Sequence, residues 1–197
     1  VDYVLECAVA EGIGDLVTVS DLSASRALRD VTEAHGGKYY ASAVGEVNVT
    51  TLMREKGAII GGEGNGGVIY PAIHAGRDAM VGVALFLSNL AHKKMKVSAL
   101  KKTYPEYHIA KNRIELSDKS LIDKILNRLQ EIFADQDVNT VDGVKISFED
   151  KREWVHLRKS NTEPIIRIYS EAKTVERAVA LGNEVIEVAR GIINEGA

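Results

Sequence analysis

Strand-like and helix-like segments alternate along the first half of the chain. Apolar residues at helical spacing predict helices at residues 1–10, 25–35, 47–56 and 78–92. Short apolar or β-branched runs predict strands at residues 16–19, 38–42, 58–60 and 68–70. An alternation of this kind packs as a largely parallel sheet between layers of helices. We therefore predict a three-layer, mixed-sheet α/β domain over residues 1–104.

The second half of the chain has a different rhythm. A strong helical stripe covers residues 121–133, and a last helical segment covers residues 175–193. Between them, strand signals at 144–148, 154–158 and 165–169 are separated by turn-forming residues. A helix, a short run of antiparallel strands and a helix make a small α+β domain. We place it at residues 105–197, with the boundary near Tyr104 and Pro105.

The composition excludes several classes of protein. The chain has 25 basic and 28 acidic residues and no run of five like charges, so it lacks the footprint of a nucleic-acid-binding protein. Cys7 is the only cysteine, which excludes an intrachain disulfide and gives no sign of an oxidising compartment. The longest apolar run, Ala79–Leu87, is too short to cross a bilayer and is predicted to be a buried helix. We expect a cytoplasmic protein that binds neither nucleic acid nor membrane, and a chain trimmed from a longer one because it opens without Met.

A glycine-rich loop occupies residues 61–67, where five of seven residues are glycine. The loop satisfies the GxGxxG pattern, but that pattern binds a dinucleotide only when a helix follows and presents its N-terminus to the pyrophosphate. The strand-like segment 68–70 and Pro71 follow here instead. A nicotinamide-dependent enzyme is therefore disfavoured.

Glu63 is the acidic side chain that this glycine-rich loop presents. A carboxylate held in such a loop can accept two hydrogen bonds from neighbouring hydroxyl groups, which suits a sugar. The alternative is a glycine-rich turn with a solvated glutamate. The residue types alone leave both interpretations open.

A second polar loop lies between two predicted strands, at residues 158–164. Arg158 and Arg167 offer planar guanidinium groups to a phosphate, and Ser160, Asn161 and Thr162 add neutral donors. Two arginines with three small donors suit a phosphate dianion. The alternative is a polar hairpin loop with surface charges.

Other polar residues have simpler interpretations. Ser23 or Ser25 can cap the helix that follows, and Asp78 can cap the helix predicted at 78–92. Arg77 either faces an anion or is a surface charge. The five histidines have no metal-ligand spacing and no GxSxG elbow is present, so we expect neither a metal site nor a serine nucleophile within this chain.

The two loops together resemble the α-D-phosphohexomutase family, which includes phosphoglucomutases, phosphomannomutases and phosphoglucosamine mutases. RKSNTEP with Arg167 resembles the phosphate-binding loop of the family's last domain, and GEGNGG resembles the sugar-binding loop of its third domain. LVTVSDLSASRALRDVTEAHGG and AVGEVNV also resemble parts of that third domain. The resemblance covers the whole chain and implies domains three and four of a four-domain enzyme.

The resemblance also implies a division of roles among residues. The residues that would bind the sugar are Gly45, Glu46, Gly62, Glu63 and Asn65. The residues that would bind the phosphate are Arg158, Ser160, Asn161, Thr162 and Arg167. The family reaction moves a phosphoryl group between O1 and O6 of a hexose through a bisphosphorylated sugar, so the implied ligands are hexose phosphates and bisphosphates.

The family's phosphoserine loop, TASHNP, and its metal loop, DGDxDR, do not occur in this sequence. The resemblance places both in domains that would precede this chain and would be its partners. No catalytic residue is therefore expected in this fragment, which alone would be inactive. Mg²⁺ would be bound in the full-length enzyme by ligands outside this chain, and the fragment itself would hold no cofactor.

The sugar-binding loop departs from the usual family pattern GExSGH. Asn65 stands at the serine position and Gly67 at the histidine position, and Val44, Gly45 and Glu46 stand where some members have Thr-Gly-His. We expect Asn65 to keep a polar contact and Glu46 to take over a contact with the sugar. The variant is most similar to prokaryotic phosphoglucosamine mutases and phosphomannomutases. A non-catalytic module that binds a phosphorylated ligand remains the alternative.

Overall fold

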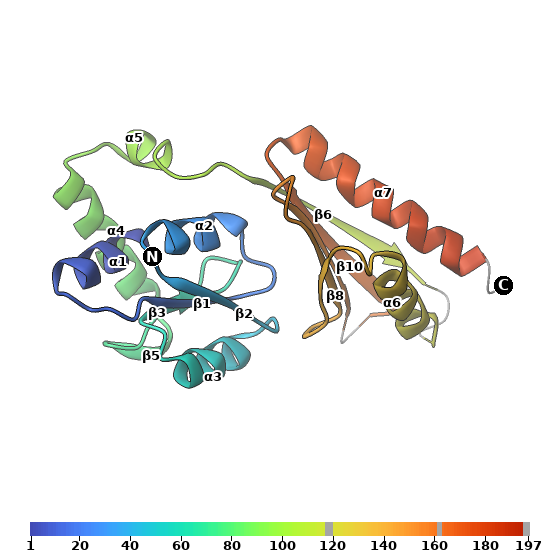
Figure 1. Cartoon of the computed structure of the whole chain (residues 1–197), viewed down its shortest axis with the longest axis horizontal. Coiled ribbons are helices and arrows are strands. Elements are labelled where there is room, and N and C mark those ends of the chain that lie inside the picture. Colours follow the sequence, from blue (N-terminus) through green and yellow to red (C-terminus); the bar gives the residue numbers. More distant parts are fainter. Residues whose placement is uncertain (117–119, 161–162, 195–197) are drawn as a thin grey trace. The chain divides into compact units, whose positions relative to one another are not determined.

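A computed structural model describes residues 1–116, 120–160 and 163–194 of the chain. The chain forms two compact units, Val1–Glu106 and Tyr107–Ala197, called unit 1 and unit 2 below (Figure 1). Each unit contains its own five-stranded sheet. No helix among the described residues has the length and apolar character needed to span a lipid bilayer.

Unit 1 is built on a mixed sheet with the strand order β2-β1-β3-β4-β5. Its strands are β1 (Val17–Asp21), β2 (Lys38–Ser42), β3 (Ile60–Gly62), β4 (Val68–Tyr70) and β5 (His74–Arg77). Strands β1, β2 and β3 run parallel to one another, whereas β4 is antiparallel to both of its neighbours, β3 and β5. The mixed sheet confirms the predicted α/β fold class.

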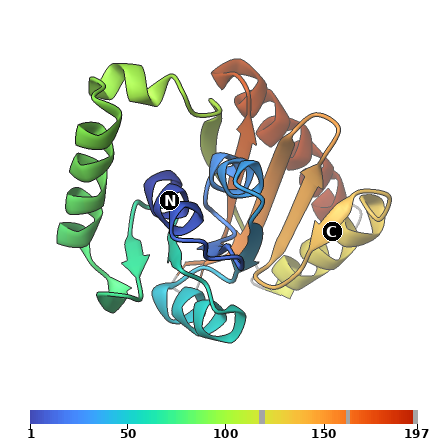
Figure 2. The same cartoon turned by 60° about the vertical axis from the view of Figure 1, so that its left-hand side comes forward.

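The helices of unit 1 cover both faces of this sheet. They are α1 (Asp2–Ala10), α2 (Arg26–Ala34), α3 (Glu46–Lys56), α4 (Ala79–Lys93) and the short α5 (Val97–Lys101). Helices α1 and α2 lie on one side of β1 and β3, and α3 lies on the other (Figures 1 and 2). Val49 and Met53 of α3 pack against Val17 and Val19 of β1, and a separate apolar cluster forms around Leu5 on the side of α1. The three layers therefore have two cores.

Helix α4 differs from the prediction of a buried helix. Met80, Val83, Phe86 and Leu87 are between 44% and 77% exposed. The helix packs against β4 and α1, and these four side chains leave an apolar surface of the helix open to solvent. The apolar pattern of this segment predicted the helix correctly, but the burial of its side chains depends on which other elements pack against the helix.

Unit 2 has an antiparallel sheet with both of its helices on one face. Its elements are β6 (His108–Glu115), α6 (Ser120–Ile132), β7 (Asp137–Asn139), β8 (Val144–Phe148), β9 (Glu153–Lys159), β10 (Ile165–Ala172) and α7 (Val175–Asn194). The strand order is β6-β10-β9-β8-β7, so the first strand of the unit pairs with the last. The predicted α+β class is confirmed.

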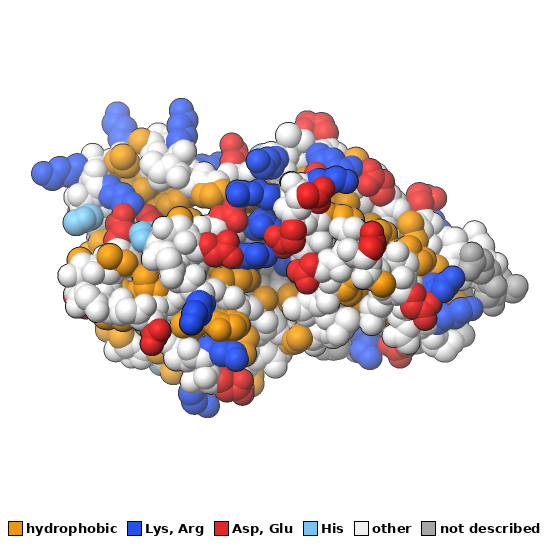
Figure 3. All heavy atoms as spheres, in the orientation of Figure 1, with side chains coloured by type: hydrophobic (Ala, Val, Ile, Leu, Met, Phe, Trp, Pro, Cys, Tyr) orange, Lys and Arg blue, Asp and Glu red, His pale blue; other side chains and the backbone are white. Residues whose placement is uncertain are grey.

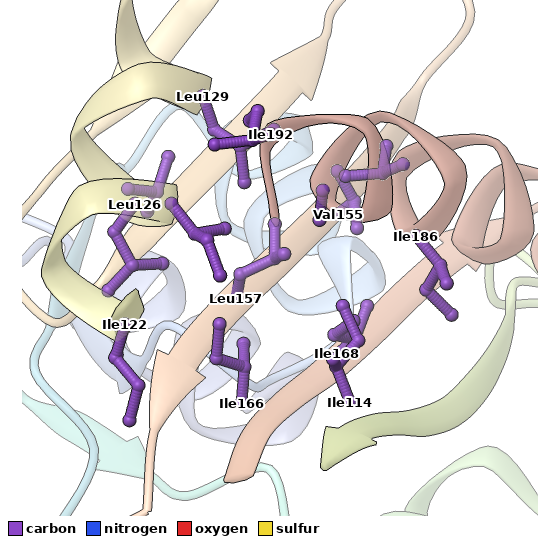
Figure 4. Packing of buried hydrophobic residues seen from close by; sticks show 14 of the residues in the cluster. Ile114, Ile122, Leu126, Leu129, Val155, Leu157, Ile166, Ile168, Ile186 and Ile192 are labelled. Carbon is purple, nitrogen blue, oxygen red and sulfur yellow. The ribbon is translucent and has the colours of Figure 1, made fainter. Parts of the chain in front are cut away.

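The core of unit 2 lies between the sheet and these two helices (Figure 4). Leu157 of β9 and Ile166 and Ile168 of β10 point toward α6 and α7, and none of the three is exposed. Alternate residues of the same strands therefore point to the opposite face of the sheet, which neither α6 nor α7 covers. This open face carries the polar residues described below.

Two strands of unit 2, β6 and β7, were not predicted from the sequence. In β6 only Ile114 is buried, so the strand lacks the apolar alternation that would have identified it. Strand β7 has only three residues, which is too short for a clear pattern. In unit 1, β5 was not predicted because, like β6, it lacks an apolar alternation: Gly76 is its only buried residue.

Candidate functional site

Three loops of unit 1 meet at one edge of its sheet. Strands β1, β2 and β3 are parallel, and Asp21 pairs with Ser42 while Ser20 pairs with Gly62 near their carboxyl ends. The segments that follow, residues 22–25, 43–46 and 63–67, therefore start from the same edge. In α/β sheets this edge is where ligands bind. Two sequence-predicted motifs, at Gly45 and Glu46 and in the glycine-rich loop, are brought together here.

The glycine-rich loop is a tight hairpin between β3 and β4. The backbone N–H of Glu63 donates to the carbonyl oxygen of Gly67 at 2.9 Å, and that of Gly66 donates to Glu63 at 3.0 Å. A side chain at Gly62 could not fit, because its Cβ would lie 2.2 Å from the carbonyl oxygen of Gly67. Asn65 Oδ1 accepts a hydrogen bond from Gly67 N at 3.0 Å. Strand β4 follows directly, as predicted, so no helix N-terminus is available to a dinucleotide.

Asp21 anchors this loop, and sequence analysis missed it. Its Oδ1 accepts hydrogen bonds from Ser23 N (3.0 Å), Ser23 Oγ (2.8 Å) and Gly64 N (3.2 Å). Asp21 is only 1% exposed. The carboxylate thus joins the turn after β1 to the glycine-rich loop. An Asp two residues before a Ser at a strand end is an Asx-turn signal that the sequence did offer.

The caps predicted from the sequence are confirmed. Ser25 Oγ accepts a hydrogen bond from Ala27 N at the start of α2, and Asp78 Oδ1 accepts one from Val81 N at the start of α4. Ser25 therefore has a local structural role in this site, and Ser23 supports the loop through Asp21.

Arg77 links the two predicted sugar-binding acids. Its Nε donates to Glu46 Oε2 at 2.9 Å, its backbone N–H donates to Glu46 Oε1 at 2.8 Å, and its Nη1 lies 3.1 Å from Glu63 Oε2. The Glu63 side chain is 5% exposed and that of Arg77 is 49% exposed. Both oxygens of Glu46 accept hydrogen bonds from Arg77, and the expected contact between Glu46 and a sugar stays a prediction.

Within the cluster of Glu46, Glu63 and Arg77, these contacts favour the charged forms of Glu46 and Arg77. The hydrogen bond from the backbone of Arg77, together with that from its side chain, holds the pKa of Glu46 below its ordinary value. The side-chain hydrogen bond to Glu46, with the nearby charge of Glu63, raises the pKa of Arg77. Arg77, which the sequence left as either an anion-facing or a surface charge, is paired with carboxylates.

Gly45 begins α3 beside this cluster. Its φ of 121° lies in a region that side-chain-bearing residues rarely adopt, and it occupies the N-cap position of the helix. The backbone there turns sharply enough to bring Glu46, in the first turn of α3, to β5. The glycine is therefore required by the conformation of the loop.

Three arginines form a row across the open face of unit 2. Arg167 of β10 is the cross-strand partner of Arg158 of β9 and of Arg113 of β6. Since Ile166 and Ile168 point into the core, Arg167 points to the open face. Like charges directly opposite one another destabilise a sheet. The row therefore favours the binding of an anion.

The arginines are compensated only in part by carboxylates. Arg158 Nε lies 3.3 Å from Asp142 Oδ2, and Arg113 Nη2 lies 2.9 Å from Glu115 Oε1 in an exposed pair. Arg167 Nη2 lies 3.7 Å from Glu163 Oε2, which is too long for a hydrogen bond, and this exposed pair contributes little. A phosphate can replace Glu163 as the partner of Arg167 at small cost.

Lys111 and Arg113 were missed by sequence analysis because β6 was not recognised as a strand. They line, with Arg167 and Tyr169, a hollow of about 540 Å³ on the open face. The Lys111 ammonium lies 5.3 Å from the centre of the Tyr169 ring. Acidic and basic side chains are mixed over the face of the molecule that Figure 3 shows. The positive charge of the hollow therefore comes from the few basic residues that line it, Lys111, Arg113 and Arg167.

Ser160 closes the loop between β9 and β10. Its backbone N–H donates to Ile165 O at 3.0 Å, and its Oγ accepts from Glu163 N at 3.4 Å. Asn161 and Thr162, the other predicted phosphate-binding residues of this loop, lie outside the described residues. Ser160 thus stands one residue beyond the end of β9, two residues from Arg158.

His156 supports the Asp142 side of the arginine row. Its Nε2 donates to the carbonyl oxygen of Asp142 at 2.6 Å, and the ring is 1% exposed. Burial lowers the pKa of His156 to about 4. The ring is therefore neutral at physiological pH and adds no charge beside Arg158.

The part of the chain that the structure describes holds no group of three or more His, Cys, Asp or Glu residues placed to bind a metal. In unit 1, the two loop carboxylates Glu46 and Glu63 are bridged by the guanidinium group of Arg77. A magnesium ion does not fit this donor set.

Comparison with known protein families gives two matches that together cover most of the chain. A model described as phosphoglucomutase/phosphomannomutase, alpha/beta/alpha domain III, matches residues 3–107. A model described as the phosphoglucomutase/phosphomannomutase C-terminal domain matches residues 112–188. The two matched segments correspond closely to the two sheets.

Individual relatives match over nearly all of this chain. A probable phosphoglucosamine mutase of Methanopyrus kandleri is 33% identical over 89% of this chain and 38% of its own length. A phosphoglucomutase/phosphomannomutase of Thermococcus kodakarensis is 35% identical over 94% of this chain and 41% of its own length. The chain thus spans 38–41% of the length of these two curated relatives.

The fold is also found in solved structures. The crystal structure of Aspergillus fumigatus N-acetylphosphoglucosamine mutase in complex with GlcNAc-6P and magnesium superposes with a TM-score of 0.69. The alignment covers 97% of this chain and 42% of that chain, at 16% sequence identity. At this identity the likeness concerns the fold.

Proposed function

Because this chain belongs to the phosphoglucomutase/phosphomannomutase family, we propose that it is the substrate-holding C-terminal half of a phosphohexomutase. In this proposal unit 1 is domain three and binds the sugar, and unit 2 is domain four and binds a phosphate. The proposed boundary between the two domains lies near Tyr104 and Pro105. The relatives carry the names of mutases, which are isomerases.

The proposed reaction transfers a phosphoryl group between O1 and O6 of a hexose through a bisphosphorylated sugar. The observation that carries the phosphate role is the row of Arg158, Arg167 and Arg113 on one sheet face. Guanidinium groups bind phosphate oxygens in a fixed, forked geometry. Ser160, with Asn161 and Thr162, would add neutral donors from the adjoining loop. The phosphate held here is the one that does not react.

The sugar role rests on the hairpin that presents Glu63 and Asn65. Gly62 and Gly45 supply the backbone conformations, and Glu46 acts within the same cluster. Binding energy from the remote phosphate and from the sugar hydroxyls would orient the reacting hydroxyl group, which lowers the barrier to transfer. No step of the chemistry is assigned to a residue of this chain.

The proposed substrates are hexose phosphates and bisphosphates, with glucosamine, glucose or mannose as the hexose. Support comes from the names of the two relatives and from the GlcNAc-6P bound in the Aspergillus fumigatus enzyme. The reactive serine and the residues that bind Mg²⁺ would belong to preceding domains. The chain alone would then bind sugar phosphate weakly and catalyse nothing.

A titration of the 197-residue chain with glucose 1,6-bisphosphate tests the proposal. We expect the backbone amide signals of Ser160 and Arg158 to shift in NMR spectra, and Arg158→Gln to abolish the shifts. Arg128→Gln, an exposed change on α6, is the charge-matched control and should bind normally. The absence of shifts at millimolar ligand in the folded wild-type chain would refute the proposal. If the longer protein binds the ligand but converts no hexose phosphate, the chain acts as a binding module only.

A further inference from the structure

We propose that Arg77 is a sugar-binding residue beside Glu63, and that Glu46 positions it; this inference rests on the sugar role proposed for unit 1. Arg77 ends β5, an edge strand that the sequence did not reveal. Its guanidinium group contacts Glu63, the acid that the glycine-rich loop presents. The residue is 31 positions from Glu46 in sequence, so only the fold brings the two together.

The sequence leaves space for Arg77 at a specific position. A Cβ at Gly67 would lie 2.7 Å from Cδ and 3.1 Å from Cγ of Arg77. A Cβ at Gly76 would lie 3.0 Å from Glu46 Oε1. The aliphatic stem of Arg77 therefore crosses the glycine-rich loop at a residue that has no side chain. A larger residue at position 67 would displace Arg77 from Glu63.

Glu46 fixes the direction of the guanidinium group. It accepts hydrogen bonds from both the backbone N–H and Nε of Arg77, so the start and the head of the side chain are held by one carboxylate. A flexible four-bond side chain would otherwise lose considerable conformational entropy on binding a ligand. This loss is reduced because the side chain is ordered in advance.

The pair of Glu63 and Arg77 matches the chemistry of neighbouring hydroxyl groups. An ionised carboxylate only accepts hydrogen bonds, whereas a guanidinium group has five N–H donors and only donates them. The protein contacts engage Nε and Nη1 of Arg77 and Oε2 of Glu63. Since a hydroxyl group both donates and accepts, one hydroxyl of a sugar can donate to Glu63 while its neighbour accepts from Arg77. Arg77 is half exposed and thus accessible to a ligand.

The test compares two ligands, glucose 6-phosphate and inorganic phosphate, by NMR titration of the 197-residue chain. Arg77→Gln should weaken binding of glucose 6-phosphate on the order of tenfold, the loss typical of one charge-assisted hydrogen bond. It should leave inorganic phosphate binding unchanged, because that ligand is held in unit 2. Arg54→Gln, in the last turn of α3, makes the same charge change without touching the cluster and should have no effect.

Hexose 6-phosphates that each lack one hydroxyl group show whether Arg77 contacts the sugar or only forms ion pairs within the protein. If Arg77 donates to one hydroxyl, the difference between wild type and Arg77→Gln should vanish for the one analogue that lacks this hydroxyl. Glu46→Gln should weaken binding less than Arg77→Gln and should add nothing to it in the double variant. Arg77→Lys keeps the charge but not the forked geometry and should fail to restore affinity. It serves as the working variant if Arg77→Gln does not fold.

Two results would overturn the inference. One is equal affinity of the wild-type chain and the folded Arg77→Gln variant for glucose 6-phosphate. The other is an equal loss for every deoxygenated analogue with full rescue by Arg77→Lys, which is the pattern of a structural ion pair. If the wild-type chain binds inorganic phosphate but no hexose phosphate, the proposed sugar role of unit 1 itself fails.

Discussion

Replacing Asp21 by alanine should loosen the candidate sugar site and destabilise unit 1. The carboxylate is 1% exposed and its Oδ1 accepts three hydrogen bonds, two from Ser23 and one from Gly64 N. The alanine variant removes the acceptor of all three donors at once. The contact between the turn after β1 and the glycine-rich loop is then lost.

The expected magnitude follows from these contacts. A hydrogen bond to a charged group contributes roughly 1.5–3 kcal/mol to stability. Ser23 is half-buried and Gly64 is exposed, so water can replace part of what the donors lose. We therefore expect Asp21→Ala to lower the free energy of unfolding of unit 1 by roughly 2–4 kcal/mol. Asp21→Asn keeps an oxygen acceptor of similar shape and should cost about half as much.

Urea denaturation can separate the two units. Trp154, the only tryptophan, lies in β9 and reports on unit 2 through its fluorescence. Far-UV circular dichroism reports on both units. Asp21→Ala should shift the circular dichroism transition of unit 1 and leave the fluorescence transition in place. Hydrogen exchange of the Gly64 amide should also accelerate.

Two outcomes would refute this reasoning about Asp21. If Asp21→Ala changes the stability of unit 1 by less than about 0.5 kcal/mol, the buried carboxylate contributes as little as an ordinary surface residue. If Gly64 exchanges at the wild-type rate in the variant, the carboxylate does not hold the glycine-rich loop.

Three further predictions concern the core, the pH dependence and the glycine-rich loop. Leu129→Ala, at a fully buried position of α6, should destabilise unit 2 by roughly 2–5 kcal/mol by Trp154 fluorescence, whereas Ile132→Ala, 43% exposed on the same helix, should cost far less. The pKa of His156 is about 4 in the folded state against 6.5 in the unfolded state, so only the unfolded state takes up a proton as the pH falls from 6.5 to 4. The free energy of unfolding of unit 2 should therefore fall by up to roughly 3 kcal/mol over this pH range. Denaturation at several pH values should show a flatter profile over the same range for His156→Gln. Gly62→Ala should broaden or shift the Glu63 and Gly67 amide signals, because its Cβ would clash with Gly67 O at 2.2 Å, and unchanged NMR spectra would contradict the hairpin described here.

The regular elements with local signals were predictable from the sequence. Helix α6 has an apolar stripe with four buried residues, and β2 was predicted with the bounds that the structure has. Gly57 ends α3 in the left-handed conformation that glycine favours, and Asp78 caps α4. These features depend on residues close together in sequence. Neighbouring side chains and backbone groups are enough to determine them.

Strand β6 could not be predicted because its partner lies far away in sequence. Its register pairs Arg113 with Arg167 and Ile114 with Ile166, more than fifty residues later. The strand is stabilised by hydrogen bonds to β10 rather than by an apolar alternation of its own. The third arginine of the row therefore became visible only with the sheet order.

The sequence by itself determined which chemistry is available: a carboxylate in a glycine-rich hairpin, and arginines beside a loop of small donors. It did so because glycine spacing and residue type act locally on the backbone and on charge. Only the tertiary structure decided which partners these groups have. Asp21 meets Gly64 across 43 residues, and Arg77 lies between Glu46 and Glu63, because parallel strands end at one edge and the β4–β5 hairpin returns to it. Long-range strand pairing sets these distances, and no short stretch of sequence encodes them.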